Sequence, residues 1–182
     1  KFGFFGGINE VLSMNITIEA LSDDKLYEAI QIWNVVVDDG EAFPQMEFLD
    51  KDTGNVFFNQ QSYTGVAFDK ETNEVVGLYI LHPNNVGRCG HICNASYAIK
   101  KERRGQHIGE LLVKHCMKKA RELGFQILQF NAVVKSNTAA LALYKKLGFV
   151  QLGVIPKGFM LKDGTYEDII VHYIDLKNIQ SF

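Results

Sequence analysis

A basic turn punctuated by glycine, KKERRGQHIGELL (residues 100–112), runs directly into an amphipathic helical pattern. The first N–H groups of a helix have no partner within the helix and lie at the positive end of its dipole, so they attract phosphate. Gly105 and Gly109 allow the backbone to approach a ligand closely, and Arg104 adds a fixed positive charge. The glycine spacing matches neither the P-loop nor the dinucleotide-binding fingerprint. The turn therefore predicts phosphate binding at a helix start or, as the plainer alternative, an ordinary loop that leads into a helix.

The segments on either side of this turn must position it, and their order predicts one α+β domain. Strands in series are followed by alternating helices and strands, which implies a mixed, mostly antiparallel sheet flanked by helices. The predicted strands are Asn15–Ala20, Thr64–Asp69, Val75–His82, His91–Ile99, Gln126–Val134, Phe149–Ile155 and Asp168–Leu176. The predicted helices run from a cap at Ser22 to Asp39, over short pieces at Met46–Leu49 and Val56–Gln60, from near His107 to Gly124, and over Ser136–Leu147.

Composition excludes several classes of protein. The 182 residues are 47% hydrophobic and carry a formal net charge of −2, so a broad nucleic-acid-binding surface is not expected. The three cysteines are too few and odd in number for a disulfide framework, which favours a reducing, cytoplasmic location. No apolar run approaches the roughly 18 residues that a membrane-spanning helix needs, so no membrane association is expected.

The amino-terminal stretch KFGFFGGINEVLS (residues 1–13) lacks the features of a signal peptide. Met14 follows it and opens a strand pattern. We therefore expect residues 1–13 to be a non-native or flexible leader and residues 14–182 to form a single domain, since no repeat or linker interrupts them.

Two segments together resemble the GCN5-related N-acetyltransferases. SYAIKKERRGQHIGELLVKH (residues 96–115) is similar to the acetyl-CoA motif of that family, Arg/Gln-x-x-Gly-x-Gly/Ala, and SNTAALALYKKLGF (residues 136–149) is similar to its closing helix. Both stand in the order and at the separation that the family shows. The resemblance implies the GNAT fold, acetyl-CoA as cosubstrate without a metal, and transfer of an acetyl group to an amine by direct attack.

The resemblance also implies roles for residues of the turn and of the strand before it. In this family the loop amides bind the pyrophosphate of coenzyme A, while amides of the preceding strand pair with the pantetheine arm and polarise the thioester carbonyl. The loop residues are here Arg104, Gly105, Gln106, His107, Ile108 and Gly109, and the strand residues are Tyr97, Ala98 and Ile99.

Two residues of the closing segment match side chains with roles in the family. Asn137 matches the asparagine that contacts the cofactor, and Tyr144 matches the tyrosine that protonates the departing thiolate. A thiol has a pKa of roughly 8.5, so a positioned O–H donor would assist its departure. The plainer alternative is that Tyr144 only packs between Leu141 and Leu147, with its hydroxyl bonded to backbone.

His107 departs from the family pattern, because it stands where the motif usually has its middle glycine. We expect His107 to adopt helical dihedral angles, as the first turn of a helix requires, and still to donate its backbone N–H. It should reduce the closeness of approach to phosphate without abolishing binding.

The sequence constrains the acceptor and the general base less than it constrains the cosubstrate. Asn94 and Asn131 lie on adjacent predicted core strands, where an amide must be paired. Either they bond to each other, or they face the gap between the strands and bind the substrate. Glu41, His91, Asn94 and Tyr97 are candidates for the base, although a lone strand histidine such as His91 is more often structural.

NASYAI, FNAVV, GVIPKGF and WNVVVDDGEAF are similar to segments of the family branch that acetylates small amino-acid-like molecules, including phosphinothricin-type enzymes. The resemblance thus implies a small-molecule amine, such as an amino acid, as acceptor, and Asn94, Asn131 and Glu41 as substrate-binding residues. The alternatives are acetylation of a protein or peptide amine and a non-catalytic acyl-CoA-binding module. A homodimer is compatible with the family, and the identity of the acceptor and of the base stays open.

A zinc site at Cys89, His91 and Cys93, with His82 upstream, is formally possible. Its spacing fits no common metal pattern, and alternating residues on one strand splay apart. We therefore predict no metal.

Overall fold

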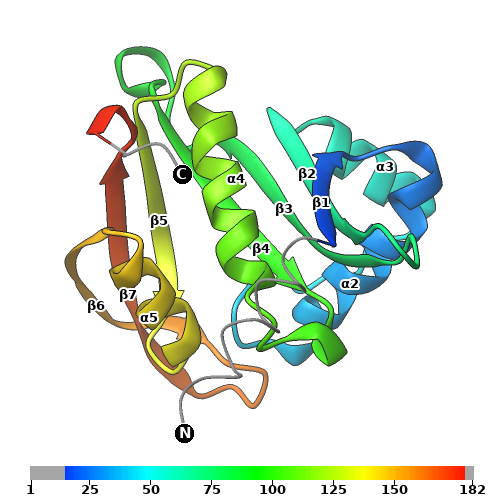
Figure 1. Ribbon diagram of the computed structural model, residues 1–182. Coiled ribbons are helices and arrows are strands. Elements are labelled where there is room, and N and C mark those ends of the chain that lie inside the picture. The colour runs from blue at the N-terminus through cyan, green and yellow to red at the C-terminus, as the bar shows by residue number, and fades with distance from the viewer. Residues whose placement is uncertain (1–14, 179–182) are drawn as a thin grey trace, which may run out of the picture.

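The computed structural model describes residues 15–178, which form a seven-stranded sheet with helices on both faces (Figure 1). The strand order is β1-β2-β3-β4-β5-β7-β6, and every neighbouring pair is antiparallel except β4 and β5. The strands are β1 (Ile16–Ala20), β2 (Tyr63–Asp69), β3 (Val75–Pro83), β4 (Ile92–Ile99), β5 (Ile127–Val134), β6 (Val150–Met160) and β7 (Tyr166–Asp175). The α-helices are α2 (Leu26–Asp39), α3 (Lys51–Asn59), α4 (Ile108–Glu122) and α5 (Thr138–Lys146). The predicted α+β fold around a mixed sheet is confirmed.

Short 3-10 turns join several of these elements. They are η1 (Asp23–Lys25), η2 (Gly87–Cys89), η3 (Lys101–Arg103) and η4 (Leu176–Asn178). The turn η3 leads from β4 to the loop before α4, and so sets where that loop begins.

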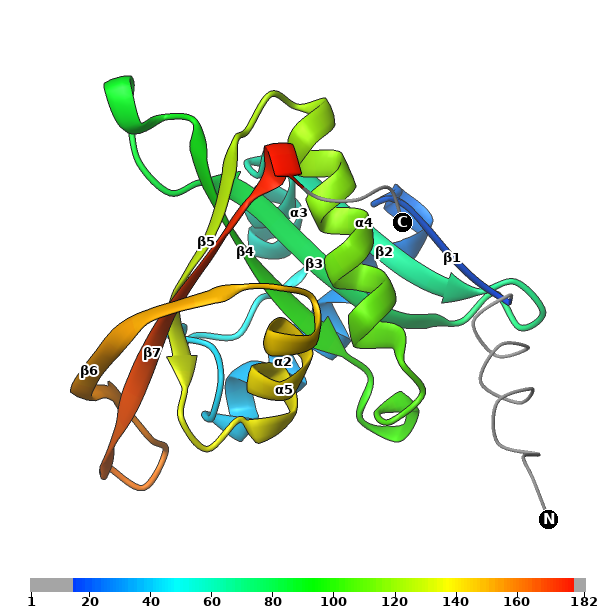
Figure 2. The same cartoon turned by 60° about the vertical axis from the view of Figure 1, so that its left-hand side comes forward.

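The central feature of the sheet is the parallel pair β4 and β5. They pair only at their first residues, where Ile92 faces Ile127 and Cys93 faces Leu128. Beyond that point the two strands part, as the separate courses of β4 and β5 on either side of α4 show (Figure 1). Figure 2 shows α5 beside the diverging ends of the two strands. The sheet therefore has an opening at its centre that its own hydrogen bonds do not close.

Each face of the sheet has its own hydrophobic core. The face covered by α4 buries residues such as Leu112 and Met117 against β3, β4 and β5, whereas α2 and α3 bury Trp33 and Phe58 against the opposite face. The apolar stripe of α2 that its 3.6-residue period predicts is buried throughout: Leu26, Ala29, Ile30, Trp33 and Val37. Because side chains alternate along a strand, neighbouring residues of β4 belong to different cores.

Several helix boundaries in the structure differ from those that the sequence predicts. No helix forms over Met46–Leu49, and the piece predicted at Val56–Gln60 is the end of α3, which begins earlier because the Asp50 side chain accepts the Thr53 N–H and caps it. Ser22 precedes η1 and its hydroxyl bonds to Asp24 rather than capping α2. The predicted leader, residues 1–13, lies outside the described residues.

Candidate functional site

A cavity of about 760 Å³ lies between the loop that precedes α4, the end of β4, helix α5 and the carboxyl end of α2. Val113 and Tyr144 belong to the core under α4, whereas Val36 belongs to the core under α2. All three line the cavity, so it extends through the opening between β4 and β5 to both faces of the sheet. Such a shape allows two reactants to meet from opposite sides.

The loop before α4 forms one end of this cavity. Arg104, Gly105, His107, Ile108 and Gly109 all line it. A Cβ atom at position 109 would lie 3.1 Å from Cδ1 of Ile99, so glycine permits the close packing of this helix start on β4. The N–H groups of Ile108 and Gly109, at the start of α4, thus lie beside the cavity, as an anion-binding helix terminus requires.

His107 does not have the helical dihedral angles that we expected. It is the N-cap of α4, with φ 60° and ψ 10°, which is the left-handed conformation. The reason is its position: the residue before the first helical residue must turn the chain sharply from the extended Arg104 through Gly105 into the helix. The left-handed conformation costs a residue with a Cβ roughly 1–2 kcal/mol, and this explains physically why the motif usually has glycine there.

The cations of the loop are already paired. Nη2 of Arg104 lies 3.4 Å from Oδ2 of Asp39 at the end of α2, and Nζ of Lys101 lies 3.6 Å from Oδ1 of the same carboxylate. Sequence reasoning singled out Arg104 but did not identify Asp39 as its partner, because 65 residues separate the two.

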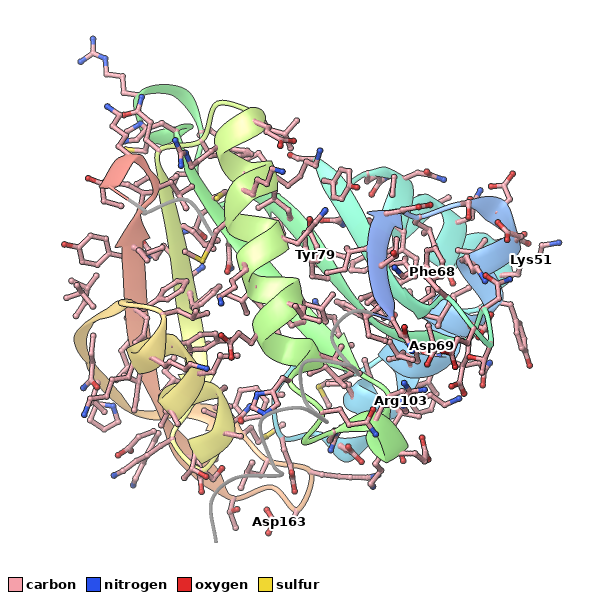
Figure 3. All side chains as sticks on the ribbon, viewed as in Figure 1. Lys51, Phe68, Asp69, Tyr79, Arg103 and Asp163 are labelled. Atoms are coloured by element: carbon pink, nitrogen blue, oxygen red, sulfur yellow. The ribbon has the colours of Figure 1, made fainter. Side chains whose placement is uncertain are left out.

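Arg103, which the sequence analysis did not single out, anchors the loop to the turn between β2 and β3. Its guanidinium bonds to Asp69 at 3.0 Å and to Glu74 at 3.1 Å, and Nε donates to Oε1 of Gln106 at 2.9 Å (Figure 3). Hydrogen bonding to Arg103 is the main cause of the lowered pKa of Asp69, and bonding to Lys100 is the main cause for Glu74. Gln106 therefore positions the loop through Arg103 and does not line the cavity.

An ion pair crosses the cavity wall between α4 and α5. Oε2 of Glu110 lies 2.6 Å from Nζ of Lys146, and Oε1 lies 2.9 Å from Nζ of Lys114. The hydrogen bond from Lys146 is the largest cause of the lowered pKa of the Glu110 carboxyl. Burial acts in the opposite direction and raises that pKa, but by less. The acid in the first turn of α4 is thus neutralised by two lysines, which limits its repulsion of an anion in the loop.

Helix α5 supplies the two residues that match the family motif. Asn137 is the N-cap of α5, and its Oδ1 accepts the Ala140 N–H at 3.2 Å. The side-chain amide nitrogen of Asn137 is not used in this cap, and the residue lines the cavity.

Tyr144 also lines the cavity and is 9% exposed. Its ring packs against Phe130 at a centroid distance of 4.5 Å, against Phe149 at 5.3 Å and against His172 at 6.0 Å. Within residues 15–178 its hydroxyl makes no hydrogen bond to backbone, so the plainer alternative of a backbone-bonded tyrosine lacks that bond. Burial raises the pKa of Tyr144 well above its usual value, which keeps the hydroxyl protonated.

The end of β4 contributes alternate residues to the wall of the cavity. Tyr97 and Ile99 line the cavity, whereas Ala98 is buried in the core under α2. The Lys100 N–H bonds to the backbone oxygen of Val76 in β3, so two residues earlier the backbone groups of Ala98 also point to β3. Those of Tyr97 and Ile99 point to the side from which β5 has parted and can pair with a ligand. Burial raises the pKa of Tyr97 well above its ordinary value, which disfavours Tyr97 as a base near neutral pH.

The two asparagines do not bond to each other. Asn94 Oδ1 accepts the Ala95 N–H at 2.8 Å, while Asn131 and Asn84 exchange two bonds of 2.6 and 3.2 Å between their side-chain amides. Cys93, Ala95 and Phe130 belong to the core under α4, so Asn94 and Asn131 lie on the opposite face of the sheet. Neither lines the cavity, whereas Glu41 does, and His91 lies at the far, paired end of β4.

The candidate zinc ligands do not share one strand, because Cys89 lies in η2 and is exposed while Cys93 is buried in β4. In residues 15–178 no three His, Cys, Asp or Glu side chains gather closely enough to hold a metal ion. None of the helices in that part of the chain is long and apolar enough to cross a membrane.

Sequence comparison identifies related proteins. Residues 25–149 match the profile described as the acetyltransferase (GNAT) family. The N-acetyltransferase aca1 of Schizosaccharomyces pombe is 31% identical over 101 residues, which make up 54% of this chain and 48% of that protein. The chain therefore spans about half the length of that curated relative.

Solved structures share the fold. A GCN5-related N-acetyltransferase from Kribbella flavida is 26% identical, with a TM-score of 0.82 over 90% of this chain and 99% of that one. A phosphinothricin acetyltransferase from Sinorhizobium meliloti, in complex with acetyl-CoA, is 20% identical, with a TM-score of 0.81 over 89% of each chain.

Proposed function

The chain belongs to the acetyltransferase (GNAT) family, and we propose that residues 14–182 act as one acetyltransferase domain that transfers the acetyl group of acetyl-CoA to the amine of a small molecule. The observation that carries this proposal is the cavity through the opening between β4 and β5, with an anion-binding helix start at one side and the protonated Tyr144 within it. A cosubstrate with a pyrophosphate and a thioester matches both features.

In this proposal each part of the coenzyme is matched to residues along the cavity. The N–H groups at the start of α4 and the Arg104 guanidinium bind the pyrophosphate, and the unpaired edge of β4 at Tyr97–Ile99 receives the pantetheine arm. Asn137 offers its free amide N–H₂ from the start of α5. The anionic ligand competes with Asp39 for Arg104, because that guanidinium is paired in the free protein.

In the proposed reaction, the neutral acceptor amine attacks the thioester carbonyl carbon directly, and the bond from that carbon to sulfur breaks. Amides of β4 stabilise the oxyanion that develops on the carbonyl oxygen. Tyr144 gives its proton to the departing thiolate, which leaves as the thiol, and the proton that the attacking nitrogen loses as it becomes the amide restores the tyrosine hydroxyl. The proton of the acceptor ammonium must leave before attack, and Glu41, which lines the cavity from the α2 side, is the candidate that can take it through water.

A small acceptor is supported by a contact that lies beside the α2 side of the cavity. Nζ of Lys162, in the turn between β6 and β7, lies 2.8 Å from both the backbone oxygen and Oδ1 of Asp38. This contact joins the turn between β6 and β7 to Asp38, at the carboxyl end of α2 and three residues before Glu41. Asn94 and Asn131 lie on that same face of the sheet, outside the lining of the cavity, and we propose that their amides contact a carboxylate or amine of a substrate that extends from it.

The test is a thiol-release assay with acetyl-CoA and a panel of amines that includes free amino acids and amino-terminal peptides. Release with a free amino acid or another small amine supports the proposal. Release with peptides alone would assign the enzyme to protein substrates. Tight acetyl-CoA binding without release for any amine would indicate a binding module.

We also propose a homodimer, supported by the edge strand β6. Val150, Leu152, Val154 and Ile155 on this strand are about half exposed, at 49, 59, 47 and 50%. Among the strands of residues 15–178, β6 pairs with β7 on one side only, and an edge strand with apolar side chains is suited to pairing with a second copy. Analytical ultracentrifugation should show a dimer for the unmodified protein and a monomer for Leu152→Lys; a monomer in both cases would contradict the proposal.

A cytoplasmic location is proposed from the cysteines. Cys89, Cys93 and Cys116 are all free thiols, and Cys93 and Cys116 are buried in the core under α4. Thiols persist in reducing compartments. Fractionation of the source cells, with detection by antibody, tests the location.

A further inference from the structure

Two adjacent arginines between β4 and α4 are held in different ways. Nη2 of Arg103 donates to Asp69 at 3.0 Å, and Nη1 donates to Glu74 at 3.1 Å (Figure 3). Nε of Arg103 donates to Oε1 of Gln106 at 2.9 Å, so each of its guanidinium nitrogens is engaged. Arg104 makes one longer contact, at 3.4 Å, to the carboxylate at the end of α2. The side chain of Arg103 is 18% exposed and that of Arg104 is 46% exposed, so Arg104 has more of its guanidinium left for a ligand.

The turn between β2 and β3, on which Arg103 is held, is itself anchored to the start of α2. The backbone oxygen of Asn73 in this turn accepts a hydrogen bond from Nζ of the buried Lys25 at 2.6 Å. The N–H of Val75, the first residue of β3, donates to Oε2 of Glu28 at 2.9 Å. Arg103 therefore ties the loop before α4 to a part of the structure that is fixed on a second side.

The loop before α4 needs such support because of its backbone conformation. Gly105 has φ 79° and His107 has φ 60°, both in the left-handed region, which is unfavourable for a residue with a Cβ atom. Gln106 lies between them, and its side chain accepts the hydrogen bond from Arg103. This bond fixes the middle of the loop and so limits the directions in which the N–H groups that follow can point.

We propose that Arg103 is a positioning residue for the nucleotide half of acetyl-CoA. Held by the carboxylates of Asp69 and Glu74, it fixes the loop through Gln106, and the N–H groups of that loop bind the pyrophosphate. This inference rests on the proposed function, in which Arg104 contacts the pyrophosphate itself. The turn between β2 and β3 thus contributes to cosubstrate affinity without touching the ligand, because donors that are already in place lose little freedom when the ligand binds.

The carboxylate of Asp69 separates this role from direct binding, which is the alternative because Arg103 also lines the cavity. If Arg103 bound phosphate itself, loss of the carboxylate would free its guanidinium and tighten binding. If Arg103 positions the loop, the same loss releases the loop and weakens binding. Asp69→Asn keeps an oxygen that can accept the N–H groups of Glu71 and Thr72, so the turn itself is preserved.

Asp69→Asn and Arg103→Gln test the inference, with Lys119→Gln as the control. Lys119 pairs with Glu122 at 2.6 Å near the end of α4 and does not line the cavity, so the control breaks an ion pair elsewhere. Calorimetry gives the dissociation constants of acetyl-CoA and of adenosine 3′-phosphate 5′-diphosphate, which carries the pyrophosphate. Ligand-observed NMR gives that of S-acetylpantetheine, which carries the thioester but no pyrophosphate. Melting temperatures record whether each variant folds.

We expect Asp69→Asn and Arg103→Gln to weaken acetyl-CoA and the nucleotide fragment by the same factor, about 3–10-fold, and to leave S-acetylpantetheine unchanged. Lys119→Gln should change none of the three dissociation constants. Tighter binding in Asp69→Asn would show that Arg103 binds the ligand directly and would overturn the inference. Unchanged affinities in both variants, or an equal loss for all three ligands, would overturn it as well. An unmodified protein that binds none of the ligands would overturn the proposed function, and this inference with it.

Discussion

Glu110 and Lys146 join the first turn of α4 to the last turn of α5, with 2.6 Å between Oε2 and Nζ. The carboxylate is largely shielded, at 15% side-chain exposure, whereas the lysine is 59% exposed. Lys146 lies two residues after Tyr144, so the pair holds the helix that carries the proposed proton donor. We expect a double-mutant cycle of Glu110→Gln and Lys146→Gln to show that the two substitutions affect kcat non-additively. Their coupling in kcat should exceed their coupling in the KM for acetyl-CoA. Additive effects on kcat would contradict this.

The same pair predicts a pH dependence of stability. The pKa of Glu110 is lowered in the folded protein, so its contribution is fully present above the ordinary carboxyl pKa, roughly 4.3, and is lost as the pH falls through the lower folded value. The difference in melting temperature between the unmodified protein and Glu110→Gln should therefore shrink below about pH 4.3. A difference that stays constant down to acid unfolding would show that Glu110 contributes by packing alone.

Tyr144→Phe should reduce kcat about 100-fold with little change in the KM for acetyl-CoA, because it removes only the proton given to the thiolate. Since burial raises the pKa of Tyr144, the rate of the unmodified enzyme should not decline through this residue below about pH 10. Tyr166→Phe, at an exposed tyrosine of β7, is the control and should leave kcat unchanged. A fully active Tyr144→Phe would assign Tyr144 to packing.

His107→Gly should melt higher than His107→Ala, because alanine keeps the Cβ that the left-handed conformation disfavours. The expected difference is about 1 kcal/mol in the free energy of unfolding, measured by urea denaturation. Acetyl-CoA affinity should be unchanged or tighter in His107→Gly. A large loss of affinity in both variants would mean that the imidazole itself holds phosphate.

Asp39→Asn should tighten acetyl-CoA binding up to about fivefold, because it frees Arg104 from a partner that competes with the pyrophosphate. Arg104→Gln should weaken binding. The gain in Asp39→Asn should diminish at high salt, which screens this exposed pair. Weaker binding in Asp39→Asn would show instead that Asp39 orients Arg104 for the ligand.

Asn94→Ala and Asn131→Ala should raise the KM for the acceptor much more than that for acetyl-CoA. Asn84→Ala is the matched control for Asn131, because it removes the partner amide and leaves Asn131 in place. Equal losses for both substrates in Asn94→Ala and Asn131→Ala would rule out their assignment to the acceptor.

Local patterns in the sequence determine the elements of this protein and the position of the loop before α4. The 3.6-residue spacing from Leu26 to Val37 predicts the buried stripe of α2, and the alternation in β4 places Tyr97 and Ile99 on one face. The RRGQHIG segment predicts the helix start that lines the cavity. These features depend on residues a few positions apart, so sequence spacing is sufficient to find them.

Contacts between distant segments were decided only by the tertiary structure. Asn131 pairs with Asn84 instead of Asn94, Arg104 pairs with Asp39, and Lys162 reaches Asp38 across 124 residues. The left-handed conformation of His107 likewise follows from how the end of β4 leads into α4. A side chain's partner depends on which elements the sheet brings together, and no local period encodes that choice.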